Sequence, residues 1–112
     1  MKKLVIIGKG PAGISAALYA VRGGLDVTIV AKDGGALQKA DKIDNYYGFD
    51  GGISARKLLE DGENQARTLG VQFVTDEVVG VEFAESGFAV KTLSKDLEAN
   101  AVVLACGTSR NV

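Results

Sequence analysis

The chain of 112 residues contains no histidine, no tryptophan, a single cysteine (Cys106) and a single proline (Pro11). The lack of histidine excludes imidazole metal ligands and general acid–base catalysis by histidine within this chain. One cysteine can form neither an internal disulfide nor a C-x-x-C redox pair. No apolar run is long enough to span a membrane, and the run before Gly8 is too short for a signal peptide. We therefore expect a soluble, cytoplasmic protein.

The charges of the chain are nearly balanced, with 13 basic and 14 acidic side chains and a net charge of -1. This balance gives no electrostatic reason to expect binding to nucleic acid or to an anionic membrane surface. The length predicts one domain, residues 1–112, with a single modest core. The 15 glycines lie in clusters, which suggests tight loops around a ligand.

A glycine-rich loop near the N-terminus is the clearest functional signal. Residues 4–7 form an apolar run typical of a buried strand, and G-x-G-x-x-G follows directly at Gly8, Gly10 and Gly13. A helical pattern over residues 14–22 and a second apolar strand over residues 25–30 complete a β-α-β unit. In this context the motif predicts dinucleotide binding, because the glycines allow a tight turn, a close pyrophosphate and close helix packing.

The second half of the chain predicts one more helix and five strands. Residues 55–69 read as a helix with Ser54 as its N-cap, and residues 71–74 as a strand. Residues 77–83 and 88–93 alternate as a hairpin around the loop 84–87, and a third antiparallel strand follows the turn at residues 94–96. The apolar run 101–105 reads as a buried central strand of the parallel sheet.

The predicted second helix has an apolar side and a charged side. Its apolar side consists of Leu58, Leu59, Ala66 and Leu69. Its charged side chains, to which we assign no function, are Arg56, Lys57, Glu60, Asp61, Glu63 and Arg67. Gly62 in the middle of the helix costs up to about 1 kcal/mol relative to alanine, so we expect close packing to require it.

Residues 31–53 show little periodicity and contain two glycine pairs and an aromatic cluster. Such a long loop in a small domain is usually functional or disordered, and its aromatic and glycine content favours an ordered loop that faces a ligand. A surface loop with aromatic side chains packed beneath it is the alternative. The same two interpretations apply to Tyr46 and Tyr47, which either stack on a ligand or fill a core or dimer contact.

Several motifs in this order resemble the N-terminal half of thioredoxin reductase and, more broadly, the pyridine nucleotide-disulfide oxidoreductases with two dinucleotide-binding domains. The motifs are Gly8-x-Gly10-Pro11-Ala12-Gly13, Gly34-Gly35-x-Leu37, Asn45-Tyr46-x-Gly48-Phe49 and Ala105-Cys106-Gly107-Thr108. The resemblance covers essentially the whole chain. It implies an α/β Rossmann-like FAD/NAD(P)-binding fold, with a parallel sheet, helices and a three-stranded antiparallel β-meander.

Carried over residue by residue, the resemblance implies FAD as the cofactor. The loop of Gly8, Gly10, Pro11, Ala12 and Gly13 would hold the pyrophosphate. The further implied contacts are Gly34, Gly35 and Leu37 along the pyrophosphate and flavin, Asn45 near the isoalloxazine, the backbone of Val78 and Val79 at the adenine, and Ala105, Cys106 and Gly107 as a second FAD-contacting motif. It gives no catalytic residue and no metal ligand in this chain.

The sequence departs from the family pattern at the end of the second strand. The acidic residue that often contacts the adenosine ribose corresponds to Ala31. Asp33 could replace it, whereas Lys32 could equally prefer a phosphate, so the choice between FAD, NAD and a phosphorylated variant stays open. Tyr47 stands where these reductases usually have proline, and Cys106 replaces a common threonine. A cysteine at the end of a buried strand is more often inert than reactive.

The family chain continues into an NADPH domain with a C-x-x-C pair and returns with a Gly-Asp segment, none of which lies in these 112 residues. A complete reductase cycle within this chain is therefore excluded. Three hypotheses remain: a thioredoxin reductase-type flavoprotein that needs a redox partner or a further segment, a non-catalytic module for FAD or NAD(P), and a remnant that acts through protein contacts. By analogy with the family we expect a homodimer.

Overall fold

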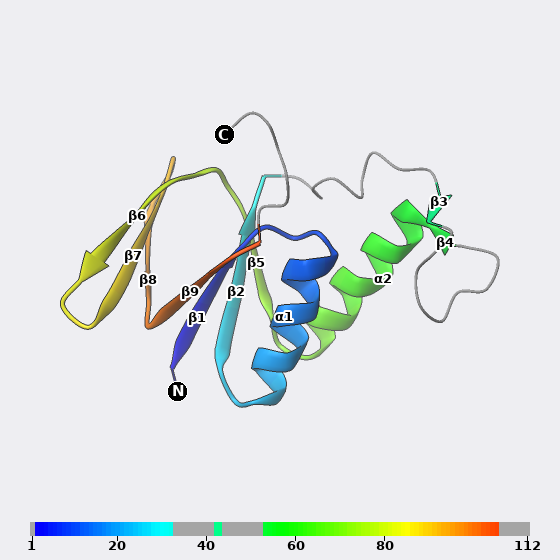
Figure 1. Cartoon of the computed structure of the whole chain (residues 1–112), viewed down its shortest axis with the longest axis horizontal. Coiled ribbons are helices and arrows are strands. Elements are labelled where there is room, and N and C mark those ends of the chain that lie inside the picture. Colours follow the sequence, from blue (N-terminus) through cyan, green and yellow to red (C-terminus); the bar gives the residue numbers. More distant parts are fainter. Residues whose placement is uncertain (1, 33–41, 44–52, 106–112) are drawn as a thin grey trace.

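The structure, a computed structural model, describes residues 2–32, 42–43 and 53–105. Its centre is a parallel sheet with strand order β5-β2-β1-β9 (Figure 1). The four strands are β1 (Lys3–Ile7), β2 (Asp26–Ala31), β5 (Gln72–Thr75) and β9 (Ala101–Leu104). β1 pairs in parallel with β2 and with β9, and β2 pairs in parallel with β5. The predicted α/β fold and parallel sheet are confirmed.

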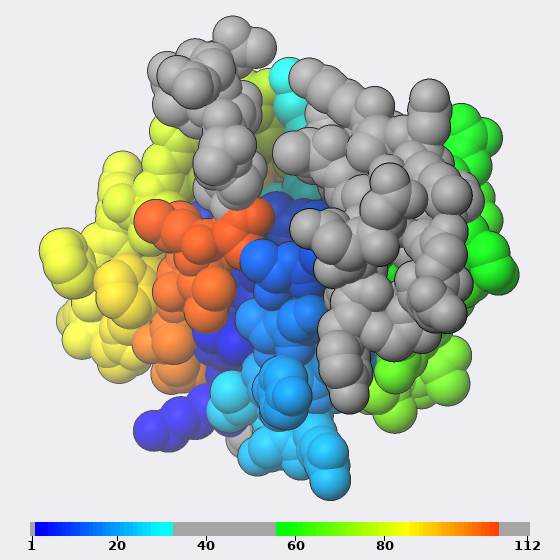
Figure 2. Space-filling model, turned by 45° about the vertical axis from the view of Figure 1, so that its right-hand side comes forward, coloured from blue at the N-terminus to red at the C-terminus, as the bar shows by residue number. Residues whose placement is uncertain are grey.

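The sheet lies between two helices and an antiparallel meander. Helices α1 (Pro11–Arg22) and α2 (Ala55–Thr68) cover one face. The meander β6 (Val78–Ala84), β7 (Gly87–Thr92) and β8 (Asp96–Ala99) covers the other. Figure 2 shows this order on one side of the molecule, with the hairpin in yellow, α1 in blue and α2 in green. The predicted helices and three-stranded antiparallel meander are confirmed, and the structure places them on opposite faces of the sheet.

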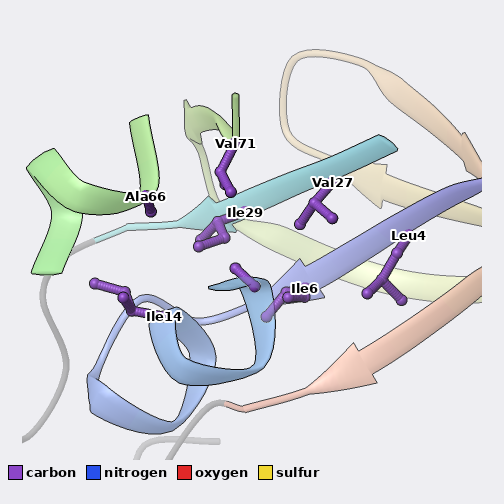
Figure 3. Packing of buried hydrophobic residues seen from close by; sticks show 8 residues of the cluster. Leu4, Ile6, Ile14, Val27, Ile29, Ala66 and Val71 are labelled. Carbon is purple, nitrogen blue, oxygen red and sulfur yellow. The ribbon is translucent and has the colours of Figure 1, made fainter. Parts of the chain in front are cut away.

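The central strands are buried on both faces, so their apolar residues run without interruption. On β1, Leu4 and Ile6 point toward the helices while Val5 and Ile7 point toward the meander. Figure 3 shows the helix-side cluster, in which Ile14 of α1 and Ala66 of α2 meet the side chains of β1 and β2. The alternation of side chains along β1 and β2 thus divides their apolar residues between two clusters, one on each face of the sheet.

Four predicted boundaries differ from the structure. α1 begins at Pro11 and not at residue 14, because proline suits the first helical position, where its missing N–H costs nothing. In the hairpin, β6 ends at Ala84 and β7 begins at Gly87, so the connecting loop has two residues and not the predicted four. The positive φ of Gly87, 149°, permits this tight turn. The predicted loop 31–53 contains a small two-stranded sheet, β3 (Lys42–Ile43) and β4 (Ile53–Ser54).

β9 was predicted to be a central strand, and within the part of the chain that the structure describes this is wrong. It lies at the edge of the parallel sheet, paired only with β1. Leu104 is 72% exposed although its sequence neighbours are apolar. An apolar run cannot by itself tell an edge strand from a central one, because strand order depends on the whole topology.

Two expectations for α2 are also wrong. Leu69 lies just beyond the end of the helix and is 52% exposed, so it does not belong to the buried side. Gly62 faces Ile14 of α1, but a Cβ added to it would lie 3.4 Å from Ile14 Cγ2, an ordinary van der Waals distance. Close packing therefore does not require glycine at position 62.

Gly13 differs from Gly62 in this respect. A Cβ on Gly13 would lie 2.2 Å from the carbonyl oxygen of Gly8 and 3.5 Å from the Cβ of Ala105. The first of these distances is impossible, and it involves a backbone atom that cannot rotate away. α1 can therefore begin this close to the end of β1 only because residue 13 has no side chain, as the glycine motif predicted.

We predict opposite effects of alanine at these two helical glycines. Gly13→Ala forces the backbone of Gly8 and α1 apart and should destabilise the chain by about 1–3 kcal/mol. Gly62→Ala gains helix propensity without a clash and should stabilise it by about 0.5–1 kcal/mol. Urea unfolding followed by circular dichroism measures both, with the parent chain as reference. Equal destabilisation by the two substitutions would contradict the packing described here.

Candidate functional site

The chain leaves β1, β2 and β9 at the same end of the parallel sheet, and hydrogen bonds join the three segments there. The amide of Gly8, directly after β1, donates to the carbonyl of Val30 at 2.9 Å. The amide of Ala105, directly after β9, donates to the carbonyl of Ile7 at 2.8 Å. These bonds extend the ladder past the strand ends and fix the loops beside each other. This end of the sheet is formed by the carboxyl ends of its strands, where open α/β folds bind their ligands.

The two glycines at the start of the loop between β1 and α1 differ in whether their backbone requires glycine. Gly8 has a φ of 115°, which residues with a side chain rarely adopt, so the sharp turn after β1 depends on it. Gly10 is the N-cap of α1 with an extended conformation (φ −74°, ψ −173°), and its carbonyl accepts a hydrogen bond from Ile14. Its backbone angles therefore do not require glycine, and its role in admitting a pyrophosphate stays a prediction.

The N-terminus of α1 is open to an anion. No side chain caps the first turn, and no acidic residue lies in it. Pro11 has no amide hydrogen, and in an α-helix the amides of Ala12 and Gly13 have no partner within the helix. These two amides and the positive end of the helix dipole point out of the loop. The arrangement suits a phosphate or pyrophosphate group.

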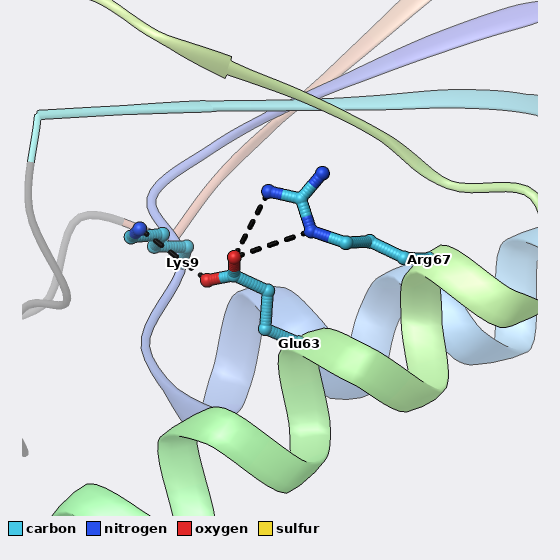
Figure 4. Close-up of polar contacts among 3 residues, drawn as sticks. All are labelled: Lys9, Glu63 and Arg67. Atoms are coloured by element: carbon cyan, nitrogen blue, oxygen red, sulfur yellow. Dashed lines mark hydrogen bonds and ion pairs between the residues drawn. The ribbon is translucent and has the colours of Figure 1, made fainter.

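The glycine loop also carries a cation that is held by α2. Figure 4 shows Lys9 and Arg67 on either side of the Glu63 carboxylate. The Nζ of Lys9 lies 3.3 Å from Oε1 of Glu63. The other oxygen, Oε2, accepts two hydrogen bonds from Arg67, of which the shorter is 2.9 Å. Arg67 in turn lies over the ring of Phe73 at 4.4 Å. Lys9, Glu63, Arg67 and Phe73 thus form one chain of contacts from the loop to β5. Glu63 is therefore partly buried and paired on both oxygens, unlike the exposed side chains of the same helix face.

The pKa of the Glu63 carboxyl lies below its ordinary value. Partial burial acts to raise it, but the hydrogen bond from Arg67 and the charge of Lys9 outweigh that effect. The sequence offered no signal for this cluster, because Lys9 and Glu63 are 54 residues apart and belong to different elements. The i,i+4 spacing of Glu63 and Arg67 was the one part that the sequence could have shown.

The end of β2 presents two of the predicted site residues, Ala31 and Lys32. Ala31 is the last residue of the strand, and Lys32 follows it with its Nζ 3.1 Å from Oε1 of Glu77. Glu77 comes from the connection between β5 and β6. The side chains of this pair are 72% and 44% exposed, so the pair is accessible from solvent.

The other predicted contacts fall partly inside the described residues. Val78 and Val79 begin β6, directly after the pair partner Glu77; Val78 packs against the meander-side core, whereas Val79 is 57% exposed. The predicted contacts outside the described residues are Gly34, Gly35, Leu37, Asn45, Cys106 and Gly107. The predicted residues that the structure brings together are therefore those of the glycine loop and Ala105.

Two features are absent from the described residues: a metal-binding cluster and a membrane-spanning helix. No group of three or more cysteine, aspartate or glutamate side chains there could hold a metal ion. No helix among them is long and apolar enough to cross a membrane. The chemistry that the described site offers is anion binding by backbone amides, with two lysines nearby.

We predict that Glu63→Gln lowers stability at neutral pH by less than about 1 kcal/mol, because its partners Lys9 and Arg67 are partly exposed. The folded-state pKa of Glu63 is lowered, so its contribution is present above the unfolded pKa. It is lost as the pH falls from about 5 through the folded pKa. The difference between the urea midpoints of parent and variant should therefore be smaller at pH 4 than at pH 7, and should disappear only below the folded-state pKa.

The matched control is Asp61→Asn, which removes an exposed i,i+4 partner of Lys57 on the same helix. We expect no measurable change from it at either pH. A Glu63→Gln effect that stays the same at pH 4 would show that the side chain matters by its packing and not by its charge.

Comparison with known proteins agrees with this geometry. Residues 2–112 match the model of the family described as pyridine nucleotide-disulphide oxidoreductase. The bifunctional thioredoxin reductase/thioredoxin of Mycobacterium leprae is 37% identical over 96% of this chain and 24% of its own length. The thioredoxin reductase of Rickettsia bellii is 35% identical over 94% of this chain and 35% of its own.

Solved structures agree as well. An atypical thioredoxin reductase from Desulfovibrio vulgaris Hildenborough superposes with a TM-score of 0.89 at 38% identity, covering 98% of this chain and 37% of that one. A thioredoxin reductase from Gloeobacter violaceus gives a TM-score of 0.91 at 35% identity, covering 99% and 38%. The chain thus spans well under half the length of these relatives. Over the part that it does span, it belongs to the pyridine nucleotide-disulphide oxidoreductase family.

Proposed function

We propose that this chain binds FAD as part of a thioredoxin reductase-like flavoprotein. The observation that carries the proposal is the convergence of Gly8, Gly13 and Ala105 at the carboxyl edge of the sheet, beneath the uncapped start of α1. Membership of the pyridine nucleotide-disulphide oxidoreductase family supports FAD as the cofactor.

The residues present fit a dinucleotide by their own chemistry. Gly13 keeps the loop close to β1, so the amides of Ala12 and Gly13 can approach a pyrophosphate without an intervening side chain. Lys9 adds a positive charge beside them, which Glu63 keeps in place and partly neutralises. The adenosine end of the ligand would then lie toward the end of β2, where Lys32 and Glu77 meet.

The flavin, when bound, would supply the electron-transfer chemistry, and the protein would supply binding and orientation. These 112 residues hold one cysteine and no histidine, so they contain no dithiol to exchange electrons with a disulfide. Turnover would therefore depend on a further segment or a redox partner. The proposal for this chain alone is cofactor binding.

The alternative is a non-catalytic module for an adenine dinucleotide, FAD or NAD(P), which the open first turn of α1 would serve equally well. In both proposals the backbone amides of the glycine loop bind a pyrophosphate. The proposals differ in the ring system beyond the pyrophosphate, which is a flavin in FAD and a nicotinamide in NAD(P).

A homodimer stays a prediction as well. Tyr19 and Leu69, both exposed, border a cavity of about 490 Å³ on the outer side of α1, and nothing identifies an occupant.

We predict that the purified chain carries, or takes up, one FAD. The visible absorbance bands of oxidised flavin should stay with the protein through gel filtration. A free FAD concentration of 100 times Kd should stabilise the fold by about 2.7 kcal/mol and raise its thermal midpoint. Riboflavin, which lacks the pyrophosphate and adenosine, is the matched control and should not raise the midpoint.

NAD, tested in the same way, separates the two proposals. A shift with FAD that NAD does not reproduce supports the flavoprotein. Equal shifts with both favour the general dinucleotide module. If neither FAD nor NAD changes the midpoint and no flavin remains with the protein, the chain does not bind a dinucleotide and both proposals fail.

A further inference from the structure

The ribose end of a dinucleotide site in this fold is normally marked by a carboxylate. An acidic residue about 20 residues beyond the glycine motif, at the end of the second strand, accepts a hydrogen bond from the ribose 2′-hydroxyl. In this chain that place is taken by Ala31, the last residue of β2, whose methyl group can accept nothing. The residue that follows is a cation, Lys32.

The neighbouring strand brings a carboxylate to the same place. β5 pairs with β2 so that Thr75 lies opposite Ala31, and the amide of Asp76 donates to the carbonyl of Ala31 at 3.2 Å. The next residue, Glu77, therefore leaves the sheet beside the end of β2. Its Oε1 lies 3.1 Å from the Nζ of Lys32. Asp33, the replacement that the sequence offers, lies outside the described residues; among the described ones, the carboxylate that Ala31 does not supply comes from the β5–β6 connection.

Of the two acidic residues in this connection, Asp76 is hydrogen-bonded within the turn, whereas Glu77 faces Lys32. The carboxylate of Asp76 accepts hydrogen bonds from the amide of Glu77 and from the hydroxyl of Ser94, so it holds the turn together. The carbonyl of Glu77 accepts the amide of Leu93 at 3.1 Å. Both the backbone N–H and the backbone C=O of Glu77 are therefore hydrogen-bonded. Its side chain is 44% exposed and lies beside Lys32.

We propose that Glu77 is the residue that selects the ribose, and that it makes this site prefer an adenosine with a free 2′-hydroxyl over one with a 2′-phosphate. This inference rests on the proposed dinucleotide function. A carboxylate accepts a hydrogen bond from a hydroxyl but repels a phosphate. Glu77 also neutralises Lys32, which would otherwise attract the 2′-phosphate. Selectivity therefore comes from repulsion as well as attraction.

The test compares two ligands that differ only in the 2′-phosphate, ADP-ribose and 2′-phospho-ADP-ribose. Isothermal titration calorimetry at low ionic strength measures both dissociation constants for the full chain. We expect the parent to prefer ADP-ribose by roughly tenfold or more, the value of one charge-assisted contact. Glu77→Gln should lower this preference by at least roughly tenfold or reverse it, because it frees Lys32 and removes the repulsion.

Two further variants make the result specific. Adding Lys32→Gln to Glu77→Gln should abolish the gain in affinity for the 2′-phosphate. Glu82→Gln is the matched control: it removes an equal charge from an exposed carboxylate on β6, whose partner is Lys91, and should leave the preference unchanged. Urea midpoints verify that each variant is folded.

The outcomes separate this inference from the function on which it rests. An unchanged preference in Glu77→Gln overturns the role of Glu77 while FAD binding stands. The role of Glu77 is also overturned if the chain binds FAD but binds neither ADP-ribose nor 2′-phospho-ADP-ribose. A folded parent chain that binds neither FAD nor ADP-ribose overturns both.

Discussion

The approach of α1 to the end of β1 is the constraint on which the rest of the site depends. The space that a Cβ of Gly13 would need is filled by the carbonyl of Gly8, 2.2 Å away. This contact places the first turn of α1 directly above the carboxyl edge of the sheet. It also brings Ala105, at the end of a strand remote in sequence, to within 3.5 Å of the same point. Backbone packing therefore provides the geometry that the proposed anion site needs, before any charged side chain is considered.

Charge around this site is arranged as two matched pairs. Lys9 on the glycine loop is held by Glu63 of α2, and Lys32 at the end of β2 is held by Glu77. The two lysines are therefore positioned without making the site strongly basic, which agrees with the net charge of the chain, -1. A ligand that carries few negative charges and a free ribose suits such a site better than a highly charged one. Both glutamates come from elements outside the glycine motif.

The sequence predicted the parallel sheet, the two helices, the meander and the glycine loop, because each has a local pattern in which periodicity and turn residues agree. It failed where the outcome depends on partners distant in the chain. The edge position of β9, the exposure of Leu69 and the small sheet β3–β4 are set by topology, which no local pattern encodes. Glu63 and Glu77 were missed as site residues for the same reason. Glu63 is 54 residues from its partner Lys9, and Glu77 is 45 residues from its partner Lys32.

The most direct test of the account is a nuclear magnetic resonance titration of the ¹⁵N-labelled chain with FAD. The account predicts that the largest shifts occur at the amides of Gly8, Gly10, Ala12, Gly13 and Ala105, which lie at the carboxyl edge of the sheet. The amides of Gly23 and Gly24, at the far end of α1, should change little. Shifts confined to the Gly23–Gly24 end, or no shifts at saturating FAD, would contradict the central claim that the glycine loop is the ligand site.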